Sequence, residues 1–340
     1  MKRFRKVLAI SGTIFLTLGI GTGVYIASMT CFREYRQTNH SLKTWMKDIK
    51  DDTKINEIIM PGSHDAGTYG MSWLGATQHL TIEEQLKLGV RYFDLRVNKV
   101  DNEYVMFHSI LNGTKFDPIL DSIVQFLDEN PSETLLLDFQ HFKNGSDDYV
   151  YNEVNERLKG KLVVQDESQN ELQYVDDLTL KETRGKCIVF FNSSSTYIKE
   201  KHIFSRNDDA CTKKGQALDS CYISDFHAYE SDKFIEIVLT NYANKIKEKI
   251  SKEEHKGIFV LQCQLTDKSL LLGPFHKERS HEENMNHHIL NFSKTEYFDI
   301  ANVIMRDFLD ENKTQSIIDL NECKGIFKKW TKGGADKNLD

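Results

Sequence analysis

Histidine, aspartate and arginine recur in this sequence at the ends of short apolar runs. In the segment IIMPGSHDAGTYG, residues 58–70, Pro61 and Gly62 stop an apolar run, and His64 and Asp65 follow. A turn needs the proline and the glycine, but it does not need an imidazole beside a carboxylate. An imidazole titrates near neutral pH and a carboxylate can orient it, so this pair is suited to general acid–base catalysis. A solvated turn is the alternative interpretation.

Three more segments carry residues of the same kind. Asp94 and Arg96 are two positions apart in YFDLRV, so both side chains point to the same side of a strand. His108 ends YVMFH, and Asp307 lies near the end of NVIMRDF. A buried ion pair or a helix cap explains each of these segments taken alone. Together, two histidines, an arginine and three aspartates at strand ends predict a catalytic site on one face of the fold.

The elements that would position these residues alternate between strands and helices. Between residues 55 and 325, the predicted strands are INEIIM, VRYFDLRV, YVMFH, TLLLDFQ, KCIVFFN, CYISDF, GIFVLQCQL and ANVIMRDF. Helices are predicted between them at TIEEQLKLG, DPILDSIVQFLDENP and SDKFIEIVLTNYANKIKEKISK. The alternation predicts an α/β fold with a TIM-type (β/α) barrel, in which reactive residues follow the carboxyl ends of the strands. An open doubly wound sheet is the alternative.

The amino-terminal residues differ in composition from the rest of the chain. Residues 1–6 are basic, and residues 7–30 contain no charged side chain. The apolar run is long enough to cross a bilayer, which predicts a transmembrane signal anchor, with a cleaved signal peptide as the alternative. By the positive-inside rule, residues 1–6 form a cytoplasmic tail, and the body is extracytoplasmic, or secreted after cleavage. The other predicted parts are a barrel at residues 31–330 and a flexible tail at residues 331–340.

Composition and charge restrict the function. Among 340 residues, 39% are hydrophobic and 28% are charged, which is typical of a folded protein and excludes wholesale disorder. The net charge is −7 without a basic stripe, so nucleic acid is not an expected partner, and the oligomeric state is left open. The six cysteines form no CxxC pair, which argues against a zinc site. Cys187 and Cys263 are predicted buried thiols, and Cys211 with Cys221 is the predicted disulfide of an extracytoplasmic body.

A family resemblance connects these motifs. IMPGSHDAGTYG, QLKLGVRYFDLRV, FHS and VIMRDF resemble, in order, successive motifs of the catalytic X domain of phosphatidylinositol-specific phospholipase C, in its small, bacterial and metal-independent form. The resemblance runs from about Ile55 to Asn321. It implies a distorted (β/α)8 barrel that cleaves phosphatidylinositol-type lipids in a membrane to diacylglycerol and an inositol cyclic phosphate.

The resemblance also implies a role for each histidine. His64 would be the general base that takes the proton from the substrate hydroxyl next to the phosphate, and Asp307 would hold its imidazole in the useful tautomer. His108, protonated and paired with Asp65, would donate a proton to the departing diacylglycerol oxygen. One base and one acid are what a phosphodiester cleavage by an internal hydroxyl requires.

Arg96 and Asp94 are implied to act on the phosphate. Arg96 would neutralise the charge that grows there, and Asp94 would orient Arg96 or bind the attacking hydroxyl. In the calcium-dependent branch of the family an acid that binds the ion stands at the position of Arg96. The resemblance therefore implies a calcium-independent enzyme with no metal ion and no other cofactor, although Asp138 could join Asp65 and Asp94 in an oxygen cluster.

Substrate recognition rests on a looser resemblance. Asn192 stands where a bacterial member has an arginine, and His227 where it has an aromatic residue. The expected head-group residues are Asp138, Gln140, Asn192, Asp225, His227 and, on the strand VLQCQL with Gln262, Gln264. The head group could be phosphatidylinositol or a glycosylated phosphatidylinositol.

Two other functions are alternatives to the phospholipase. A metal-dependent glycerophosphodiesterase on the same barrel would need a Glu/Asp metal cluster near the first histidine, and this sequence has no Glu at its predicted strand ends. A non-catalytic lipid- or protein-binding barrel would be indicated by the loss of a predicted catalytic residue, and none is lost.

Overall fold

Part of the chain has a defined placement. The computed structural model describes residues 40–163, 175–193, 204–205, 218–222, 257–264, 285–286, 289, 298 and 302–328. The predicted transmembrane segment at residues 7–30, the predicted helix at residues 231–252, Asp225, His227 and Cys211 lie outside these ranges. None of the helices within them is long and apolar enough to cross a bilayer.

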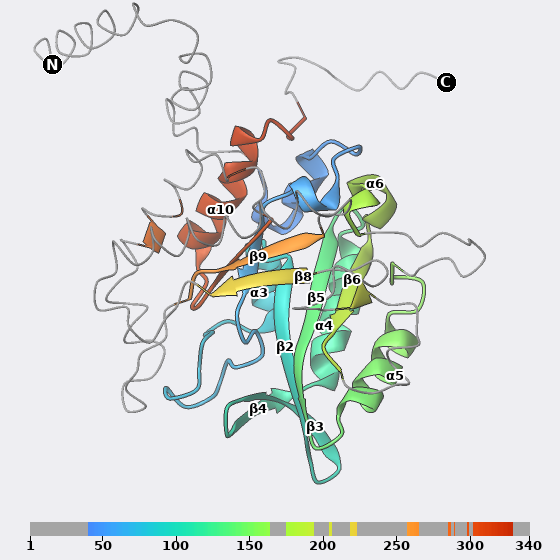
Figure 1. Cartoon of the computed structure of the whole chain (residues 1–340), viewed down its shortest axis with the longest axis vertical. Helices are drawn as coiled ribbons and strands as arrows, with labels where there is room; N and C mark the ends of the chain where they lie inside the picture. Colours follow the sequence, from blue (N-terminus) through green and yellow to red (C-terminus); the bar gives the residue numbers. More distant parts are fainter. Residues whose placement is uncertain are drawn as a thin grey trace, which may run out of the picture. The chain divides into compact units, whose positions relative to one another are not determined.

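One curled sheet organises the described residues (Figure 1). From β1, parallel neighbours follow in one direction as β2, β5, β6 and β7, and in the other direction as β10, β9 and β8. The strands on this path are β1 (Met60–Ser63), β2 (Tyr92–Val100), β5 (Thr134–Lys143), β6 (Lys186–Phe191), β7 (Phe204–Ser205), β8 (Leu218–Tyr222), β9 (Ile258–Gln262) and β10 (Val303–Arg306).

The strand order identifies the architecture. The last strand, β10, pairs in parallel with the first, β1, from Met60 with Val303 to Ser63 with Arg306. In a doubly wound sheet the last strand would lie at an edge, whereas in a barrel it returns to the first. The order is that of a TIM-like barrel whose ends are β7 and β8, which are not paired in the part of the chain described. The predicted α/β, TIM-like fold is therefore confirmed, and the doubly wound alternative is wrong.

Two strand predictions need correction. The run INEIIM does not form one strand, because Ile55–Glu57 is a 3-10 helix, η2, and β1 begins only at Met60. The backbone N–H of Ile55 donates to Leu178 O, which directs the chain inward before the barrel strand begins. The run YVMFH lies in β3 (Glu103–His108), which is antiparallel to β2 and forms a hairpin with β4 (Leu111–Lys115) instead of a barrel strand.

Helices connect the strands and pack against the sheet. They are η1 (Leu42–Asp48), α3 (Ile82–Leu88), α4 (Asp117–Glu129), α5 (Asp147–Arg157), η3 (Val175–Asp177), α6 (Leu180–Thr183) and α10 (Glu311–Cys323). The α3 helix begins after Thr81, whose hydroxyl accepts from Glu84 N, and it ends at Gly89 with a left-handed φ of 104°. The predicted start and end of this helix are confirmed.

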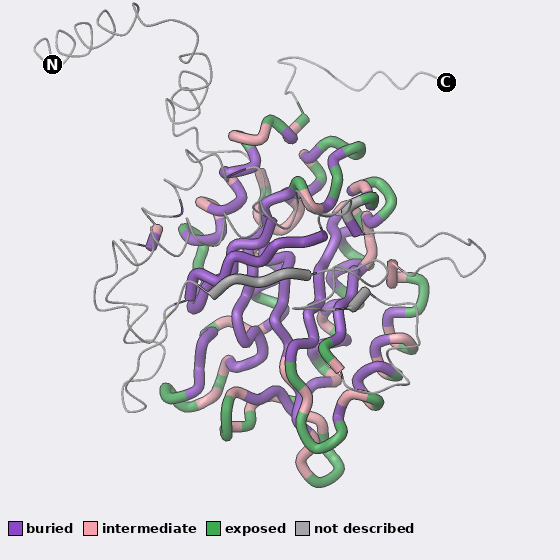
Figure 2. The backbone as a smooth tube through the Cα atoms, in the orientation of Figure 1, coloured by how far each residue is buried: buried purple, intermediate pink, exposed green. Residues whose placement is uncertain are grey.

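The central strands of the sheet are buried over most of their length (Figure 2). Side chains on the two faces of the sheet pack into different clusters. On β5, Leu135, Leu137 and Phe139 pack outward with α3, α4 and α5, whereas Leu136 belongs to the cluster inside the curl. The inner cluster also contains Met60, Tyr92, Ile188, Val260, Val303 and Met305. Because alternate residues of a strand share a face, Asp94 and Asp138 continue this inner face. The inside of the curl is thus apolar where the strands begin and polar where they end.

Candidate active site

The loop after β1 places His64 and Asp65 at the carboxyl end of the strands. Gly62 must be small, because a Cβ atom there would lie 2.7 Å from Val303 Cγ1 across the β1–β10 pair. Asp65 has a left-handed φ of 43°, which few non-glycine residues adopt. Its backbone N–H donates to Asp94 Oδ2 at 3.2 Å, and this bond ties the turn to β2. Uncommon backbone conformations held by such contacts are typical of functional sites.

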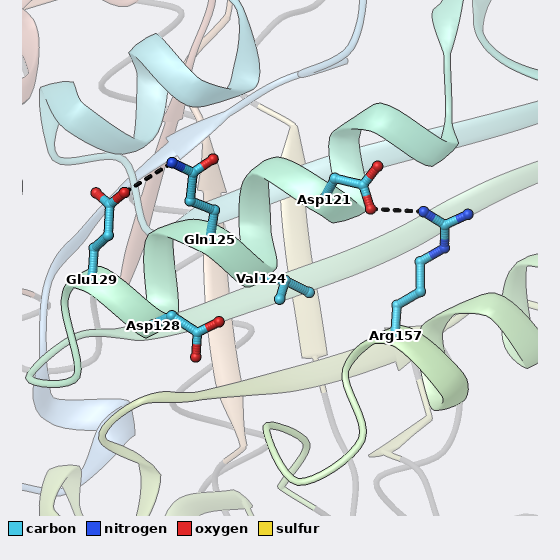
Figure 3. Close-up of a pocket in the computed structure, with 6 residues that line it drawn as sticks. All are labelled: Asp121, Val124, Gln125, Asp128, Glu129 and Arg157. Carbon is cyan, nitrogen blue, oxygen red and sulfur yellow. Dashed lines mark hydrogen bonds and ion pairs between the residues drawn. The ribbon is translucent and has the colours of Figure 1, made fainter.

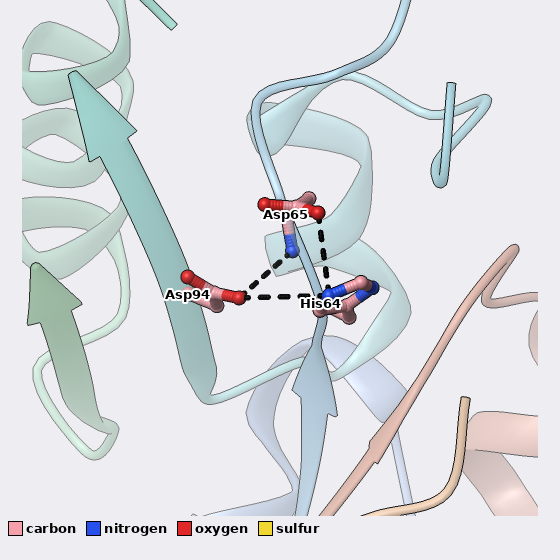
Figure 4. Close-up of side chains that lie close together, drawn as sticks. All are labelled: His64, Asp65 and Asp94. Carbon is pink, nitrogen blue, oxygen red and sulfur yellow. Dashed lines mark hydrogen bonds and ion pairs between the residues drawn. The ribbon is translucent and has the colours of Figure 1, made fainter. Parts of the chain in front are cut away.

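The imidazole of His64 is held by Asp307. Nδ1 lies 2.7 Å from Asp307 Oδ1, and because a carboxylate only accepts, Nδ1 carries a proton. Nε2 is then the nitrogen that gains or loses a proton, and it lies 3.2 Å from Asp65 Oδ2 and 4.0 Å from Asp94 Oδ2 (Figure 4). His64 is only 8% exposed, so its interpretation as a solvated turn histidine is wrong.

The surroundings of His64 raise its pKa. Burial lowers the pKa, but the carboxylates of Asp65 and Asp307 outweigh burial and the opposing charge of Arg96, so the pKa is raised to about 9. The high pKa gives Nε2 a strong affinity for a proton, which abstraction from a hydroxyl requires. It also makes the imidazolium the main form of His64 at neutral pH.

Arg96 lies between two carboxylates. Its Nε is 2.6 Å from Asp65 Oδ1 and 3.1 Å from Asp94 Oδ1, and its terminal nitrogen is 2.7 Å from Asp94 Oδ2. Burial raises the pKa of Asp94, but the charges of Arg96 and His64 outweigh it and lower this pKa below its ordinary value. Asp94 is therefore ionised and fixes the guanidinium beside His64 Nε2, at 3.3 Å.

His108 approaches Asp65 from the β3–β4 hairpin. Its Nδ1 lies 2.8 Å from Gly75 O, and because a carbonyl only accepts, Nδ1 carries a proton. Nε2 faces Asp65, 3.6 Å from Oδ2. The structure thus brings all six predicted catalytic residues into one network, with Asp65 between two imidazoles and one guanidinium; they are His64, Asp65, Asp94, Arg96, His108 and Asp307.

Part of this network has the donor atoms of a metal site. One ligand atom each of His64, Asp65 and Asp94 lies within 4.8 Å of the others. Arg96, however, bonds both carboxylates, so a cation there would meet a fixed positive charge. Asp138 does not belong to this group of donors, and its Oδ2 accepts from the hydroxyl of Tyr92 at 2.5 Å.

The predicted head-group residues lie in several places. On β5, Asp138 is fully buried, and the buried Gln140 donates to Tyr92 Oη at 3.3 Å. After β9, Gln264 donates to Gln262 Oε1 at 2.7 Å, and both are buried. Asn192 is exposed just after β6 and donates to Gln140 O at 3.1 Å. Asp225 and His227 lie outside the described residues.

Three functional candidates were missed by the sequence reasoning. Tyr92 links the polar inner face of β5 to β2 through its hydroxyl, although it reads as an ordinary strand residue. Thr77 and Gln78 are buried beneath the His64 turn, with exposures of 0% and 1%. Their signal in the sequence is weak, because a buried Thr-Gln pair and a solvated Thr-Gln pair in a loop have the same sequence.

A hollow away from this network lies on the surface between α4 and α5 (Figure 3). Its polar groups already have partners: Arg157 contacts Asp121 at 2.7 Å, and Gln125 donates to Glu129 at 2.8 Å. It contains none of the predicted catalytic or head-group residues; its lining is Asp121, Val124, Gln125, Asp128, Glu129 and Arg157.

Comparison with known sequences finds a matching family model and several relatives. The family model described as phosphatidylinositol-specific phospholipase C, X domain, matches residues 52–193. A Listeria monocytogenes protein named 1-phosphatidylinositol phosphodiesterase is 28% identical over 144 residues, 40% of this chain and 44% of that protein. The human PI-PLC X domain-containing protein 3 is 36% identical over 155 residues, 35% of this chain and 47% of that protein. The chain thus spans about half the length of the curated relatives it matches.

Comparison of structures adds the fold. The phosphatidylinositol-specific phospholipase C of Listeria monocytogenes superposes with a TM-score of 0.59, at 19% identity, over 83% of this chain and 99% of that one. At this identity the likeness shows the fold alone, and it agrees with the TIM-like strand order. The family resemblance predicted from the motifs is confirmed: residues 52–193 of this chain match the family model of the phosphatidylinositol-specific phospholipase C X domain.

Proposed function

We propose that this chain is a phosphatidylinositol-specific phospholipase C, which cleaves the phosphodiester of a phosphatidylinositol-type lipid by attack of the lipid's own hydroxyl. The observation that carries the proposal is the position of Asp65 between His64 Nε2, His108 Nε2 and Arg96. Each histidine is held through Nδ1, so Nε2 of each faces the same small region. A base, an acid and a phosphate-binding cation are thereby within reach of one phosphodiester.

The first step forms a cyclic phosphate. His64 Nε2, once deprotonated, takes the proton of the inositol hydroxyl adjacent to the phosphate, and the oxygen of that hydroxyl attacks the phosphorus. Asp307 stabilises the resulting imidazolium through its bond to Nδ1. Arg96 neutralises the charge on the phosphate oxygens as the new bond forms.

The same step releases the lipid. As the bond from phosphorus to the glycerol oxygen breaks, His108 donates the proton on Nε2 to that oxygen. The products are diacylglycerol and an inositol phosphate with a five-membered cyclic diester. Asp65 holds the protonated His108 in place before transfer, at 3.6 Å.

The proposed reaction needs no metal ion. A guanidinium held by Asp65 and Asp94 supplies the fixed positive charge that a calcium ion supplies in metal-dependent phosphodiesterases. A metal-dependent glycerophosphodiesterase is less well supported, because the donor group found among the described residues is already bonded to Arg96.

The inner face offers a place for the head group. Beyond Asp94, the buried polar side chains inside the curl are carboxylates and amides, which bind hydroxyl groups by donating and accepting hydrogen bonds. Gln140 Oε1, Gln262 Nε2 and Gln264 Oε1 are buried without a protein partner, so these atoms are available to a polyhydroxylated ligand. This supports an inositol ring as the proposed head group.

An apolar rim borders the site. Trp73, Leu74 and Ile110 are 58%, 41% and 89% exposed, and we call them the apolar rim. The rim belongs to the loop that bonds His108 through Gly75 O and to the turn that follows His108. Apolar side chains beside a lipid-cleaving centre support insertion into the membrane that holds the substrate.

Removing the rim is expected to weaken binding to lipid without harming the chemistry. The double variant Trp73→Ser/Ile110→Ser should reduce sedimentation of residues 33–340 with phosphatidylcholine vesicles about tenfold or more, since each buried apolar side chain contributes about 1.5–3 kcal/mol. Turnover of a water-soluble, short-chain phosphatidylinositol should stay within twofold. Gln125→Ser, on the exposed side of α4, is the control. Unchanged sedimentation of the double variant would rule out the rim as a membrane contact.

A membrane-anchored, extracytoplasmic body remains part of the proposal. Cys323 in α10 is disulfide-bonded, which supports an oxidising compartment. Cys187 and Cys263 are buried thiols outside any disulfide, as predicted. The predicted Cys211–Cys221 pair involves side chains outside the described part of the chain.

The activity can be tested by phosphorus NMR. Residues 33–340 incubated with phosphatidylinositol in excess EDTA should produce the resonance of a five-membered cyclic phosphate. Product that forms only after calcium is added would show that Arg96 does not replace a metal. If neither condition gives product, glycosylated phosphatidylinositol is the next substrate, and failure there would favour the non-catalytic binding barrel.

A further inference from the structure

Gln78 connects the two loops that carry His64 and Asp307. It is 1% exposed, and its Nε2 donates to His64 O at 3.1 Å and to Arg306 O at 3.0 Å. Its Oε1 accepts from Leu309 N at 3.2 Å. Both N–H groups and the carbonyl of this one amide are therefore used, and each bond goes to backbone beside the His64–Asp307 pair.

The β1–β10 pairing ends where this pair begins. The parallel ladder stops at Ser63 and Arg306, so the next residue on each strand, His64 or Asp307, lies beyond its regular hydrogen bonds. Beyond that point the two loops are joined by His64 N to Arg306 O, at 3.3 Å, and by the Gln78 amide.

Neighbouring contacts hold the two loops against the same segment. Thr77 O accepts from Phe308 N at 2.7 Å, and Thr77 Oγ1 donates to His64 O at 3.0 Å. From the opposite side, Lys313 Nζ in α10 donates to Phe308 O at 2.8 Å. The loop that carries Asp307 is thus fixed to α10 by Lys313 and to the His64 turn by Thr77 and Gln78.

We propose that Gln78 is a positioning residue that sets the separation of His64 Nδ1 and Asp307 Oδ1. The expected effect on kcat rests on the proposed function, whereas the expected effect on the His64–Asp307 separation does not. All three of these hydrogen bonds of Gln78 go to backbone atoms, so it acts through the backbone of the two loops. An amide suits this position because it bonds two carbonyls and one N–H at once in a buried space, where leaving Leu309 N without its acceptor would be costly.

The test compares Gln78→Met with a control at another buried amide. Met has a similar length but cannot bridge the carbonyls. Asn321 in α10 is the matched control, because it is also a buried amide and it braces the residue before β1, donating to Ile59 O at 2.8 Å and accepting from Ile59 N at 2.7 Å. Asn321→Leu therefore removes a comparable brace at the other end of β1, away from His64.

The measurements use the full chain in detergent micelles with ¹⁵N-labelled histidine. They give the pKa of His64 by NMR, kcat and KM for phosphatidylinositol, and the urea midpoint of unfolding. Gln78→Met should lower kcat about 10- to 100-fold, the cost expected of a small misplacement, with KM within twofold. The His64 pKa should fall, because Asp307 is less closely held. Asn321→Leu should lower the urea midpoint but leave the His64 pKa unchanged.

The outcomes separate the two proposals. A His64 pKa in Gln78→Met equal to that of the parent chain would overturn the positioning role, whatever the kinetics. A lowered pKa in a chain whose parent has no activity would support the positioning role and overturn the proposed function. If Gln78→Met does not fold, Gln78→Asn replaces it, since its amide is one methylene too short to reach all three backbone groups.

Discussion

His64→Ala is expected to lower kcat for phosphatidylinositol cleavage by about 10²- to 10⁴-fold, the range of general acid–base catalysis by a positioned side chain. His64 Nε2 is the proton acceptor of the proposed reaction, and Asp307 holds the ring from the other nitrogen. The variant should bind vesicles as the parent does, because His64 is buried and the apolar rim is untouched. Initial rates of cyclic phosphate formation, with a vesicle-binding control, check this.

A double-mutant cycle distinguishes a base from a structural residue. Asp307→Asn alone should also reduce kcat, because the amide is a poorer partner for the imidazolium at Nδ1. In combination with His64→Ala it should cost almost nothing more, since Asp307 acts through His64. Additive losses from the two substitutions would show that the pair does not act as a unit.

The same histidine makes stability depend on pH. Its pKa in the folded chain is raised to about 9, above the ordinary 6.5. The stabilisation is therefore complete below pH 6.5 and is lost as the pH rises through 9, a fall in the free energy of unfolding of about 3 kcal/mol. The free energy of unfolding in urea is measured at pH 6.5 and pH 9 for the parent chain and for His64→Ala. The variant should lack this part of the decrease, and an equal decrease in both chains would contradict the raised pKa of His64.

Arg96→Lys is expected to lower kcat about 10²- to 10³-fold. This is the cost of removing one hydrogen-bond donor that points at a developing charge. A lysine keeps the charge but not the planar fork that bonds Asp65 and Asp94 together. The loss should appear in kcat more than in KM, since the charge on the phosphate oxygens grows only as the reaction proceeds.

The control for Arg96 is another arginine that bonds two carboxylates. Arg157 in α5 contacts Glu153 and Asp121 on the protein surface, each at 2.7 Å, and Arg157→Lys should leave kcat unchanged. Both variants are assayed in EDTA and in calcium. If Arg96→Lys keeps half of the parental kcat, the guanidinium is not the group that stabilises the transition state.

The sequence allowed the central geometry to be predicted because that geometry follows from strand chemistry. Asp94 and Arg96 had to share a face, since they are two positions apart in a strand. His64 follows the first parallel strand and Asp307 the last, and in a barrel these strands are neighbours. Local residue types together with barrel topology were therefore sufficient to bring the network together.

Other features depend on contacts that spacing does not reveal. His108 was expected at the end of a barrel strand, but it reaches Asp65 from an antiparallel hairpin, because β2 continues to Val100 and turns back. Ile55 and Ile58 read as strand residues, yet burial in the inner cluster is compatible with a 3-10 turn. Gln78 is recognisable only after the fold shows that it is buried between two loops.

The pairing of β1 with β10 also has a consequence for biosynthesis. His64 and its partner Asp307 are 243 positions apart, so a growing chain cannot assemble the proton-transfer pair until nearly all of it has been made. A barrel whose first and last strands meet closes its catalytic centre late, because long-range contacts form after local ones. A nascent or truncated chain that contains the matched residues 52–193 would lack Asp307, so under the proposed function we expect it to be inactive toward lipid.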